Sequence, residues 1–319
     1  MTPVFHVVGA TGSGKSALAA ALAAETGAAV VNADAFQLYR GMEVLTAAPT
    51  PAERAAAPHF LYGVLDSAET CDAARYAAMA RDVLRQLAAE KTPAIVVGGS
   101  GLYIKALTHG LAELPSDGAL RAELAARPAA ENIAELQRLD PAGAAVMNLA
   151  NPRYVQRALE LCRLTGRPAS ELRATWSGPD PGGLRGVLLE WPRETLHRRI
   201  EARTRAMFAA GVLDEVRHLG PTSATAEKAI GLREVRSVLS GAITPEQAVE
   251  AISTSTRQYA KRQGTWFRRE KWLLRLQADV SSHQALVSIA LGAWKSGICA
   301  SGEPASEFGA EPHPASSHP

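Results

Sequence analysis

Short apolar runs alternate with longer amphipathic segments over the first part of the chain. Three runs rich in β-branched residues predict β-strands, at residues 4–8, 29–31 and 94–97. The segments between them carry apolar residues at helical spacing, at 16–27, where Gly27 is placed to end the helix, and at 73–90. Because parallel strands need crossover connections, this alternation predicts an α/β fold, with a parallel sheet and helices on both its faces.

The pattern changes after about residue 114, where helical segments separated by Pro and Gly take over. They cover residues 120–126, 130–139 and 153–164, and a Pro/Gly-rich stretch follows at 177–183. The apolar run Gly186–Glu190 then predicts a strand that returns to the sheet. Helical patterns resume at 194–208, 232–239 and 245–269, the last with Thr244 as N-cap and Pro245 in the first turn.

These patterns predict an interrupted core followed by a tail. We expect an α/β core of residues 1–114 and 185–275, a helical insertion at 115–184, and a C-terminal tail at 276–319 that is largely disordered. Within the tail, residues 285–294 are apolar enough to form a helix, but nothing in the sequence decides whether such a helix docks on the core.

The composition excludes some classes of protein but does not indicate a function. The chain has 319 residues, 47% of them apolar, and 34 Lys plus Arg against 32 Asp plus Glu give a net charge of +2. Wholesale disorder is excluded. The cysteines, Cys71, Cys162 and Cys299, are too far apart for a zinc motif and are odd in number, which favours free thiols in a reducing cytoplasm. No uncharged apolar run reaches the ~18 residues of a membrane span, so we expect a cytoplasmic protein without a membrane partner, and a monomer.

The clearest motif is G-x-x-x-x-G-K-[ST], which lies directly after the first predicted strand and before the first predicted helix. Its residues are Gly9, Ala10, Thr11, Gly12, Ser13, Gly14, Lys15 and Ser16. In this setting, backbone N–H groups converge on phosphate oxygens, Lys15 reaches the terminal phosphates and the Ser16 hydroxyl binds Mg²⁺. The flanking elements favour this interpretation over an empty Gly-rich turn. We therefore predict a P-loop NTPase-like fold that binds a diphosphate or triphosphate.

Two more polar residues follow predicted strands at the edge of the sheet where ligands bind in open α/β folds. Asp34 follows the second strand, and Ser100 follows the third within a Gly-rich turn. Asp34 is a candidate catalytic carboxylate, with a simple turn cap as the alternative. For Ser100, turn chemistry and a functional role are equally compatible with the sequence.

Arg203 lies on the apolar face of its predicted helix, in the sector of Leu196, Ile200 and Met207. A guanidinium in such a position needs an anion. The anion is either the ligand's diphosphate or a core carboxylate such as Asp34, and the sequence leaves both open.

Two predicted helices carry basic stripes although the net charge is near zero. In the 245–269 helix, Arg257, Lys261 and Arg268 share one side, and Tyr259 and Trp266 lie opposite and are expected to pack inward. In the 153–164 helix, the basic side is made of Arg153, Gln156 and Arg157, facing away from Val155, Leu159 and Cys162. Such stripes are typical of proteins that bind a polyphosphate backbone, although unconnected solubilising charges would look the same.

Taken together, the ordered blocks of sequence resemble the tRNA dimethylallyltransferases (IPP transferases). The blocks are GATGSGKS, DAFQLYRGMEVLTAAP, PHFLYGVLD, VVGGSGLYIKAL, NPRYVQRALEL, RIEARTRAMFAAGVLDEV, KAIGLREV and TRQYAKRQGTWFRR, spread over residues 4 to about 272. The chain departs from the family pattern in carrying Ser100 for the usual threonine, and it has Ala48 where the family supplies a lysine.

The resemblance implies transfer of a dimethylallyl group from dimethylallyl diphosphate to N6 of adenine 37 in tRNAs that read codons beginning with U. It implies that the phosphate loop holds the diphosphate with Mg²⁺ and that Asp34 is the general base. By the same resemblance, Ser100 and Arg203 contact the diphosphate, and the helical insertion grips the anticodon stem. The implied tRNA contacts are Asp34, Ala35, Phe36, Gln37, Ser100, Arg121, Arg153, Tyr154, Val155, Gln156, Arg157, Lys228, Ala229, Ile230, Gly231, Leu232 and Arg233.

Two other functions are compatible with a phosphate loop alone. A small-molecule kinase would use the loop for ATP, but it has no need of the two basic stripes. An RNA-binding regulator would use a nucleotide as a switch without catalysing a transfer.

Overall fold

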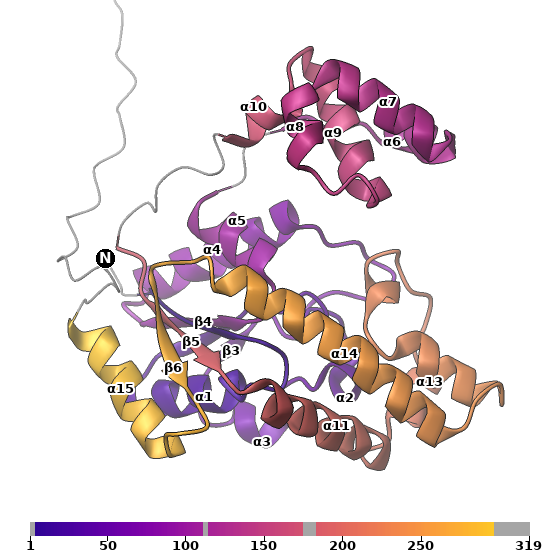
Figure 1. Cartoon of the computed structure of the whole chain (residues 1–319). Helices are drawn as coiled ribbons and strands as arrows, with labels where there is room; N and C mark the ends of the chain where they lie inside the picture. The colour runs from indigo at the N-terminus through magenta and orange to yellow at the C-terminus, as the bar shows by residue number, and fades with distance from the viewer. Residues whose placement is uncertain (1–3, 111–113, 175–182, 297–319) are drawn as a thin grey trace, which may run out of the picture. The chain divides into compact units, whose positions relative to one another are not determined.

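The computed structural model describes residues 4–110, 114–174 and 183–296. By contacts the chain divides into two compact units (Figure 1). The first comprises Met1–Thr108 and Pro181–Pro319, and the second comprises His109–Asp180. The second unit is inserted in the sequence of the first, with boundaries a few residues before the predicted 115–184.

The first unit is built on a six-stranded parallel sheet, in the order β3-β2-β4-β1-β5-β6. The strands are β1 (Val4–Gly9), β2 (Ala29–Asn32), β3 (His59–Phe60), β4 (Ala94–Gly98), β5 (Gly186–Glu190) and β6 (Leu273–Gln277). In the register of the central strand, Val7 pairs with Val97 on one side and Val187 on the other. The chain reaches β5 only after the second unit, so the sheet is completed by residues from both sides of the insertion.

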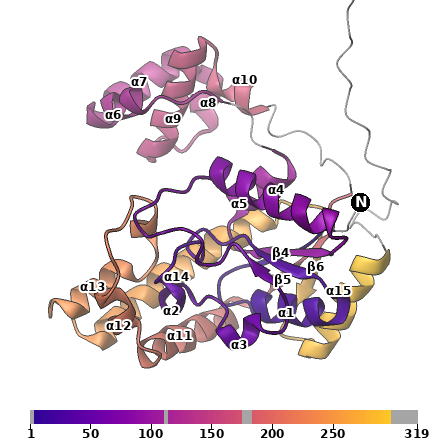
Figure 2. The ribbon, with the colours of Figure 1, turned by 180° about the vertical axis from the view of Figure 1, so that it is seen from behind.

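Helices cover both faces of this sheet. The described helices of the first unit are α1 (Lys15–Thr26), α2 (Glu43–Thr46), α3 (Pro51–Arg54), α4 (Ala73–Ala89), α5 (Gly101–Thr108), α11 (Arg193–Ala209), α12 (Val212–Arg217), α13 (Leu232–Leu239), α14 (Pro245–Phe267) and α15 (His283–Ser296), with a 3₁₀ turn at Ala226–Lys228. Helices α1 and α15 lie side by side on one face (Figure 2), and α11 and α14 pack together with α14 against β1. The predicted α/β class is confirmed.

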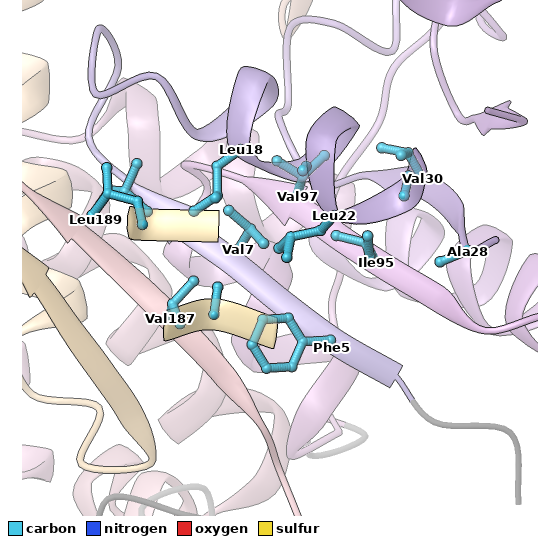
Figure 3. Packing of buried hydrophobic residues seen from close by; sticks show 14 of the residues in the cluster. Phe5, Val7, Leu18, Leu22, Ala28, Val30, Ile95, Val97, Val187 and Leu189 are labelled. Atoms are coloured by element: carbon cyan, nitrogen blue, oxygen red, sulfur yellow. The ribbon is translucent and has the colours of Figure 1, made fainter. Parts of the chain in front are cut away.

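Alternating side chains of β1 explain the two-layered packing. Phe5 and Val7 point into a cluster with Leu18 and Leu22 of α1 (Figure 3), while the intervening His6 and Val8 are buried on the other face. A strand buried on both sides reads as a continuous apolar run, which is why its position was predictable.

Local sequence signals set several helix ends. Gly27 ends α1 with φ 68°, a left-handed conformation that suits glycine. At the start of α14, the Thr244 side chain accepts from the backbone N–H of Gln247, and the Gln247 side chain accepts from the N–H of Thr244. Both ends agree with the sequence prediction.

The second unit is a small helical bundle with its own core. Its helices are α6 (Gly118–Ala126), α7 (Ala129–Leu139), α8 (Pro141–Val146), α9 (Pro152–Thr165) and α10 (Ala169–Ala174). Leu124, Leu136 and Leu159 are fully buried in it. Two acids are buried in this unit, Asp140 at the start of α8 and Glu160 of α9.

Three features of the sheet region differ from the sequence prediction. Strand β3 has two residues, too few for a pattern, and the edge strand β6 is interrupted by the exposed Arg275. The predicted tail at 276–319, expected to be largely disordered, contains an ordered helix up to residue 296, because α15 buries Leu286, Ala290 and Trp294 against the core. Trp294 stacks on Phe5 with 5.1 Å between ring centroids. Residues 297–319, Cys299 among them, and most of 177–183 lie outside the described residues.

Within the described ranges, no helix combines the length and the apolar character that crossing a membrane requires.

His6 makes the stability of the first unit pH-dependent. Burial lowers the pKa of its imidazole from 6.5 to about 4, against the opposing effect of the hydrogen bond between Nδ1 and the Arg185 carbonyl. The unfolded chain therefore binds this proton near pH 6.5 and the folded chain only near pH 4. We expect the free energy of unfolding to fall by roughly 3 kcal/mol as the pH drops across this window.

Chemical denaturation of wild type and His6→Gln at pH 7.5, 6, 5 and 4 measures this effect. The variant should lose the component of the pH dependence that lies between 6.5 and 4, while His283→Gln, at an exposed position, should retain it. If the free energy of unfolding changed with pH equally in wild type and His6→Gln, His6 would not titrate on unfolding.

Candidate active site

The phosphate loop connects the end of β1 to the start of α1. Gly12 and Gly14 have φ values of 81° and 90°, which only glycine adopts without strain. A Cβ on Gly9 would lie 3.0 Å from the Leu189 carbonyl oxygen, so the loop also packs closely against the end of β5. Lys15 is the first residue of α1, so the loop's amides and the helix N-terminus face the same ligand position.

A pocket of about 410 Å³ opens above this loop. It brings together residues from four parts of the first unit: the loop, the end of β2, the α2 region and α11. Its lining is Thr11, Gly12, Gly14, Lys15, Ser16, Asp34, Gln37, Thr46, Ala47, Arg199, Ala202 and Arg203. Three predicted site residues that are distant in sequence, Lys15, Asp34 and Arg203, therefore share one pocket.

The charges in the pocket influence one another. Burial lowers the pKa of the Lys15 ammonium, Asp34 opposes that shift and Arg203 adds to it. Burial also lowers the pKa of Arg203, again opposed by Asp34. In the described chain, no ion pair within 4.0 Å joins Arg203 to Asp34 or to another carboxylate. Two half-buried cations, Lys15 and Arg203, against one carboxylate leave the pocket suited to an anion of more than one charge.

The backbone of Asp34 is fixed by the fully buried Asn32. The Asn32 side chain accepts from the N–H of Asp34 at 2.8 Å and donates to the Leu61 carbonyl at 2.9 Å. One carboxylate oxygen of Asp34 accepts from the N–H of Phe36 at 3.1 Å. This short turn holds the carboxylate at the edge of the sheet, where it faces the phosphate loop.

Ser100 lies beside this turn but not in the lining of the pocket. Its N–H donates to the Ala33 carbonyl at 3.2 Å, and a Cβ on Gly98 would lie 2.2 Å from the same oxygen. The loop after β4 is therefore pressed directly against the loop that carries Asp34.

Gln263 of α14, which sequence reasoning missed, links two of the site's loops. Its Oε1 accepts from the N–H of Thr11 and its Nε2 donates to the Gly99 carbonyl, both at 2.8 Å. The side chain is only 4% exposed, and a Cβ on Gly99 would approach its Nε2 to 2.2 Å. The available signal was a polar residue on the buried face formed by Thr256, Ala260 and Phe267.

Arg199 and Trp191, also missed, hold the phosphate loop from its carbonyl side. Arg199 Nε donates to the Gly12 carbonyl and Trp191 Nε1 donates to the Ser13 carbonyl, both at 2.8 Å. The guanidinium lies 4.5 Å from the centre of the indole ring, so the two donors stack on each other. Together with Gln263 they fix the loop's backbone before any ligand binds.

In the second unit, the buried Glu160 organises two of the predicted arginines. Arg121 Nε lies 2.9 Å from its Oε1 and Arg157 Nη1 lies 2.5 Å from its Oε2. The N–H of Asp117 donates to the same carboxylate at 2.7 Å. Hydrogen bonds and the nearby guanidinium charge outweigh burial and lower the pKa of Glu160. Arg153 and Tyr154 are exposed at the start of the same helix, α9.

Several predicted contact residues are buried instead. The side chains of Val155, Ala229 and Leu232 lie in the hydrophobic interior, which does not fit the expected contact of these side chains with tRNA. Lys228 and Arg233 of the same segment are exposed. The prediction that the aromatic side chains of α14 pack inward is wrong for Trp266. This residue is 37% exposed, because the neighbouring Phe267 fills the core instead.

The comparisons with known proteins agree with this architecture. The sequence model of the IPP transferase family matches residues 37–270. A tRNA dimethylallyltransferase of Akkermansia muciniphila is 42% identical over 276 residues, covering 86% of this chain and 93% of the relative. This chain belongs to the IPP transferase family. A second relative with the same name, from Anaeromyxobacter sp. (strain K), is 44% identical over 276 residues, covering 83% of this chain and 90% of the relative.

Solved structures of the family have the same fold. The tRNA delta(2)-isopentenylpyrophosphate transferase of Staphylococcus epidermidis superposes with a TM-score of 0.67 at 27% identity, covering 92% of this chain and 99% of the other. A eukaryotic dimethylallyltransferase, described as acting on tRNA, superposes with a TM-score of 0.78 at 23% identity, covering 94% and 81%. The resemblance and the P-loop-like α/β fold predicted from sequence are both confirmed.

Proposed function

We propose that this protein transfers a dimethylallyl group from dimethylallyl diphosphate to N6 of adenine 37, in tRNAs that read codons beginning with U. The observation that carries the proposal is the convergence of Lys15, Asp34 and Arg203 on one pocket above the phosphate loop, in a chain whose relatives are named tRNA dimethylallyltransferases. Its buried free cysteine Cys71 suits the cytoplasm, where we propose that it acts as a monomer.

The reaction needs charge stabilisation at one end and proton removal at the other. As the bond from N6 to the allylic carbon forms, the bond from that carbon to the diphosphate oxygen breaks and diphosphate leaves with the electron pair. Lys15, Arg203 and the amides of the phosphate loop stabilise the departing charge. Adenine N6 is a weak nucleophile because its lone pair is delocalised into the ring, so Asp34 takes its proton as the new bond forms. The base reaches the pocket by leaving the stack.

The donor set of the pocket fits Mg²⁺. Magnesium is usually held by one or two protein oxygens together with phosphate oxygens and water, and the pocket offers the Ser16 hydroxyl next to the position of the diphosphate. No cluster of three metal-binding side chains occurs among the described residues, so a site of protein ligands alone is not expected there. When bound, the ion neutralises charge on the diphosphate.

We propose that the second unit binds the anticodon stem through the arginines around Glu160. This buried carboxylate holds Arg121 and Arg157 in fixed positions, and it removes one unit of charge while leaving both guanidinium groups on the surface side. Phosphates bind most tightly to guanidinium groups whose positions are already set.

Glu160→Gln should weaken tRNA binding about threefold to tenfold, although it adds net positive charge. Counting charges alone predicts tighter binding, so the sign of the change separates positioning from bulk electrostatics. Fluorescence titration with unmodified tRNA at several salt concentrations measures the Kd. Glu123→Gln, which removes an exposed carboxylate from the same unit, is the matched control and should not weaken binding. Tighter binding by Glu160→Gln would contradict the positioning role.

Gln263→Leu should lower kcat about tenfold to a hundredfold while changing the Kd for tRNA by less than threefold. The substitution leaves the N–H of Thr11 and the carbonyl of Gly99 unpaired in a buried place, so the two loops lose their alignment. Gln263→Glu, which keeps the acceptor for Thr11, should fall between Gln263→Leu and wild type. Single-turnover prenyl transfer measures the rates, and a normal kcat for Gln263→Leu would exclude this role.

Incubation with unmodified tRNA and labelled dimethylallyl diphosphate, without ATP, tests the proposed function. We expect label in the tRNA, released as N6-(dimethylallyl)adenosine on nuclease digestion, with one diphosphate per transfer. Steady loss of the γ-phosphate of ATP without prenyl transfer would instead indicate a kinase. Binding of RNA and nucleotide without either reaction would indicate a regulator.

A further inference from the structure

Glu215 of α12 holds the short helix α2 by its backbone. Its Oε2 accepts from the N–H of Val44 at 2.7 Å, and its Oε1 accepts from the N–H of Leu45 at 2.8 Å. Helices α12 and α2 pack together within the first unit (Figure 2). Both oxygens of one carboxylate are therefore used on a segment that lies 170 residues earlier in the chain.

Helix α2 depends on this support because it is only one turn long. It has four residues, and a single helical turn is unstable on its own in water. The N–H groups of a first turn are usually satisfied by the side chain of the N-cap residue. In α2 that residue is Met42, which makes no such hydrogen bond. Glu215 supplies, from another helix, the acceptor that the N-cap residue lacks.

Glu215 itself has no basic partner among the described residues. No Lys, Arg or His nitrogen of theirs lies within 4.0 Å of its carboxylate, and the nearby Arg40 pairs with Asp66 instead. Burial and the neighbouring Glu43 carboxylate raise the pKa of Glu215, and the hydrogen bonds from α2 oppose that shift. A half-buried carboxylate without a cation costs stability unless its hydrogen bonds compensate. Its value to the protein therefore lies in what those bonds hold.

The other end of α2 forms a wall of the pocket above the phosphate loop. Thr46, its last residue, and Ala47, its C-cap, line that pocket together with Gln37 and Asp34. Gln37 Nε2 donates to the carbonyls of Thr46 and Ala47, at 3.0 and 3.1 Å. An amide with both of its N–H donors on fixed carbonyls has a defined orientation. The position of α2 therefore sets the position of Gln37 in the pocket that holds Asp34.

We propose that Glu215 is a positioning residue for prenyl transfer and acts through α2 on Gln37. The hydrogen bonds form one connected series, from Glu215 to the start of α2 and from the end of α2 to Gln37. Glu215 does not line the pocket, so it acts without touching a substrate. A displacement of about 1 Å in an active site can cost a factor of about 100 in rate. The proposal rests on the proposed function and adds a residue that builds its site.

Amide hydrogen exchange on the full-length protein tests the first link without any substrate. Glu215→Gln leaves only one oxygen for two N–H groups, so the amides of α2 should exchange at least tenfold faster than in wild type. Asp214→Asn, which changes the neighbouring exposed carboxylate of α12, is the matched control and should leave their exchange unchanged. Glu215→Asp, too short to reach both N–H groups, takes the place of Glu215→Gln if that variant does not fold. Unchanged exchange in the Glu215 variant would overturn the proposal.

Single-turnover prenyl transfer tests the second link. We expect Glu215→Gln to lower the rate about tenfold at saturating dimethylallyl diphosphate, while the Kd for tRNA changes by less than threefold. Asp214→Asn should react at the wild-type rate. A purely structural role for Glu215 would lower Tm and leave the rate of the folded enzyme unchanged. A wild-type rate in Glu215→Gln would therefore contradict positioning.

A double-mutant cycle with Gln37→Met tests the route of the effect. Methionine keeps the length of the side chain but has no amide for the carbonyls of α2. In that background, adding Glu215→Gln should slow transfer by less than a further twofold, because the side chain that α2 orients is already gone. Losses that multiply would show that Glu215 does not act through Gln37. Absence of transfer by wild type would overturn the proposed function instead, and the exchange experiment would still decide whether Glu215 holds α2.

Discussion

Asp34→Asn is expected to lower kcat for prenyl transfer by about 10²–10⁴-fold while leaving the Kd for tRNA nearly unchanged. The substitution keeps the size of the side chain and the acceptor for the N–H of Phe36, so the turn around Asn32 stays intact. It removes the group that accepts the proton from N6. The loss therefore appears only where the new bond forms, which is in the transition state.

Single-turnover transfer at saturating dimethylallyl diphosphate gives the rate, and direct titration gives the tRNA affinity. Asp66→Asn, an exposed carboxylate paired with Arg40 on the same unit, should react at the wild-type rate. If Asp34→Asn instead weakened tRNA binding a hundredfold with normal turnover, Asp34 would be a binding residue and the base would have to be sought elsewhere.

The central sheet was predictable because each of its strands has a local signature. β1, β2 and β4 are short β-branched runs with Gly or Asp after them at the edge where ligands bind, and β5 is a short apolar run. β3 and β6 form the two edges, where one strand has two residues and the other carries an exposed arginine. Edge strands need less apolar sequence, so periodicity alone does not find them.

The same distinction applies to the site. The phosphate loop and Asp34 follow strands, and Arg203 breaks the apolar pattern of its own helix, so each is visible in a short stretch of sequence. Gln263 acts on Thr11, 252 residues away, and Trp191 on Ser13, 178 residues away, through hydrogen bonds to the backbone. A hydrogen bond to a backbone group does not depend on the partner's side chain, so it cannot be predicted from composition or from residue spacing. Such contacts become visible only when the fold brings the two segments together.

Trp266 shows how a correct helix can still be given the wrong face. The prediction used the two aromatic residues of the stripe to define the buried side. The structure instead buries Ile252, Thr256, Ala260, Gln263 and Phe267, which follow one another every three or four residues. Two of these five are polar, so the buried face is not the most apolar one. Gln263 is buried for its hydrogen bonds, and Trp266 next to Gly101 is left partly exposed.

Arg203→Gln is expected to lower kcat/KM for dimethylallyl diphosphate by about 10²–10³-fold. Arg203 is one of two half-buried cations in the pocket, and no described carboxylate pairs with it, so its charge is available to the departing diphosphate. Arg205→Gln, on the same helix but exposed and paired with Glu201, is the matched control and should be close to wild type. Steady-state kinetics over a range of diphosphate concentrations measures both.

A double-mutant cycle with Asp34→Asn then decides between the two roles that the sequence left open for Arg203. If Arg203 acts on the diphosphate and Asp34 on N6, the two substitutions remove separate contributions and the losses in kcat/KM multiply, within a few-fold. If Arg203 served chiefly to neutralise Asp34, removing the carboxylate would make the arginine dispensable, and the double variant would be no slower than Asp34→Asn alone. We expect the multiplicative result, because Arg203 and Asp34 line the same pocket without forming an ion pair among the described residues.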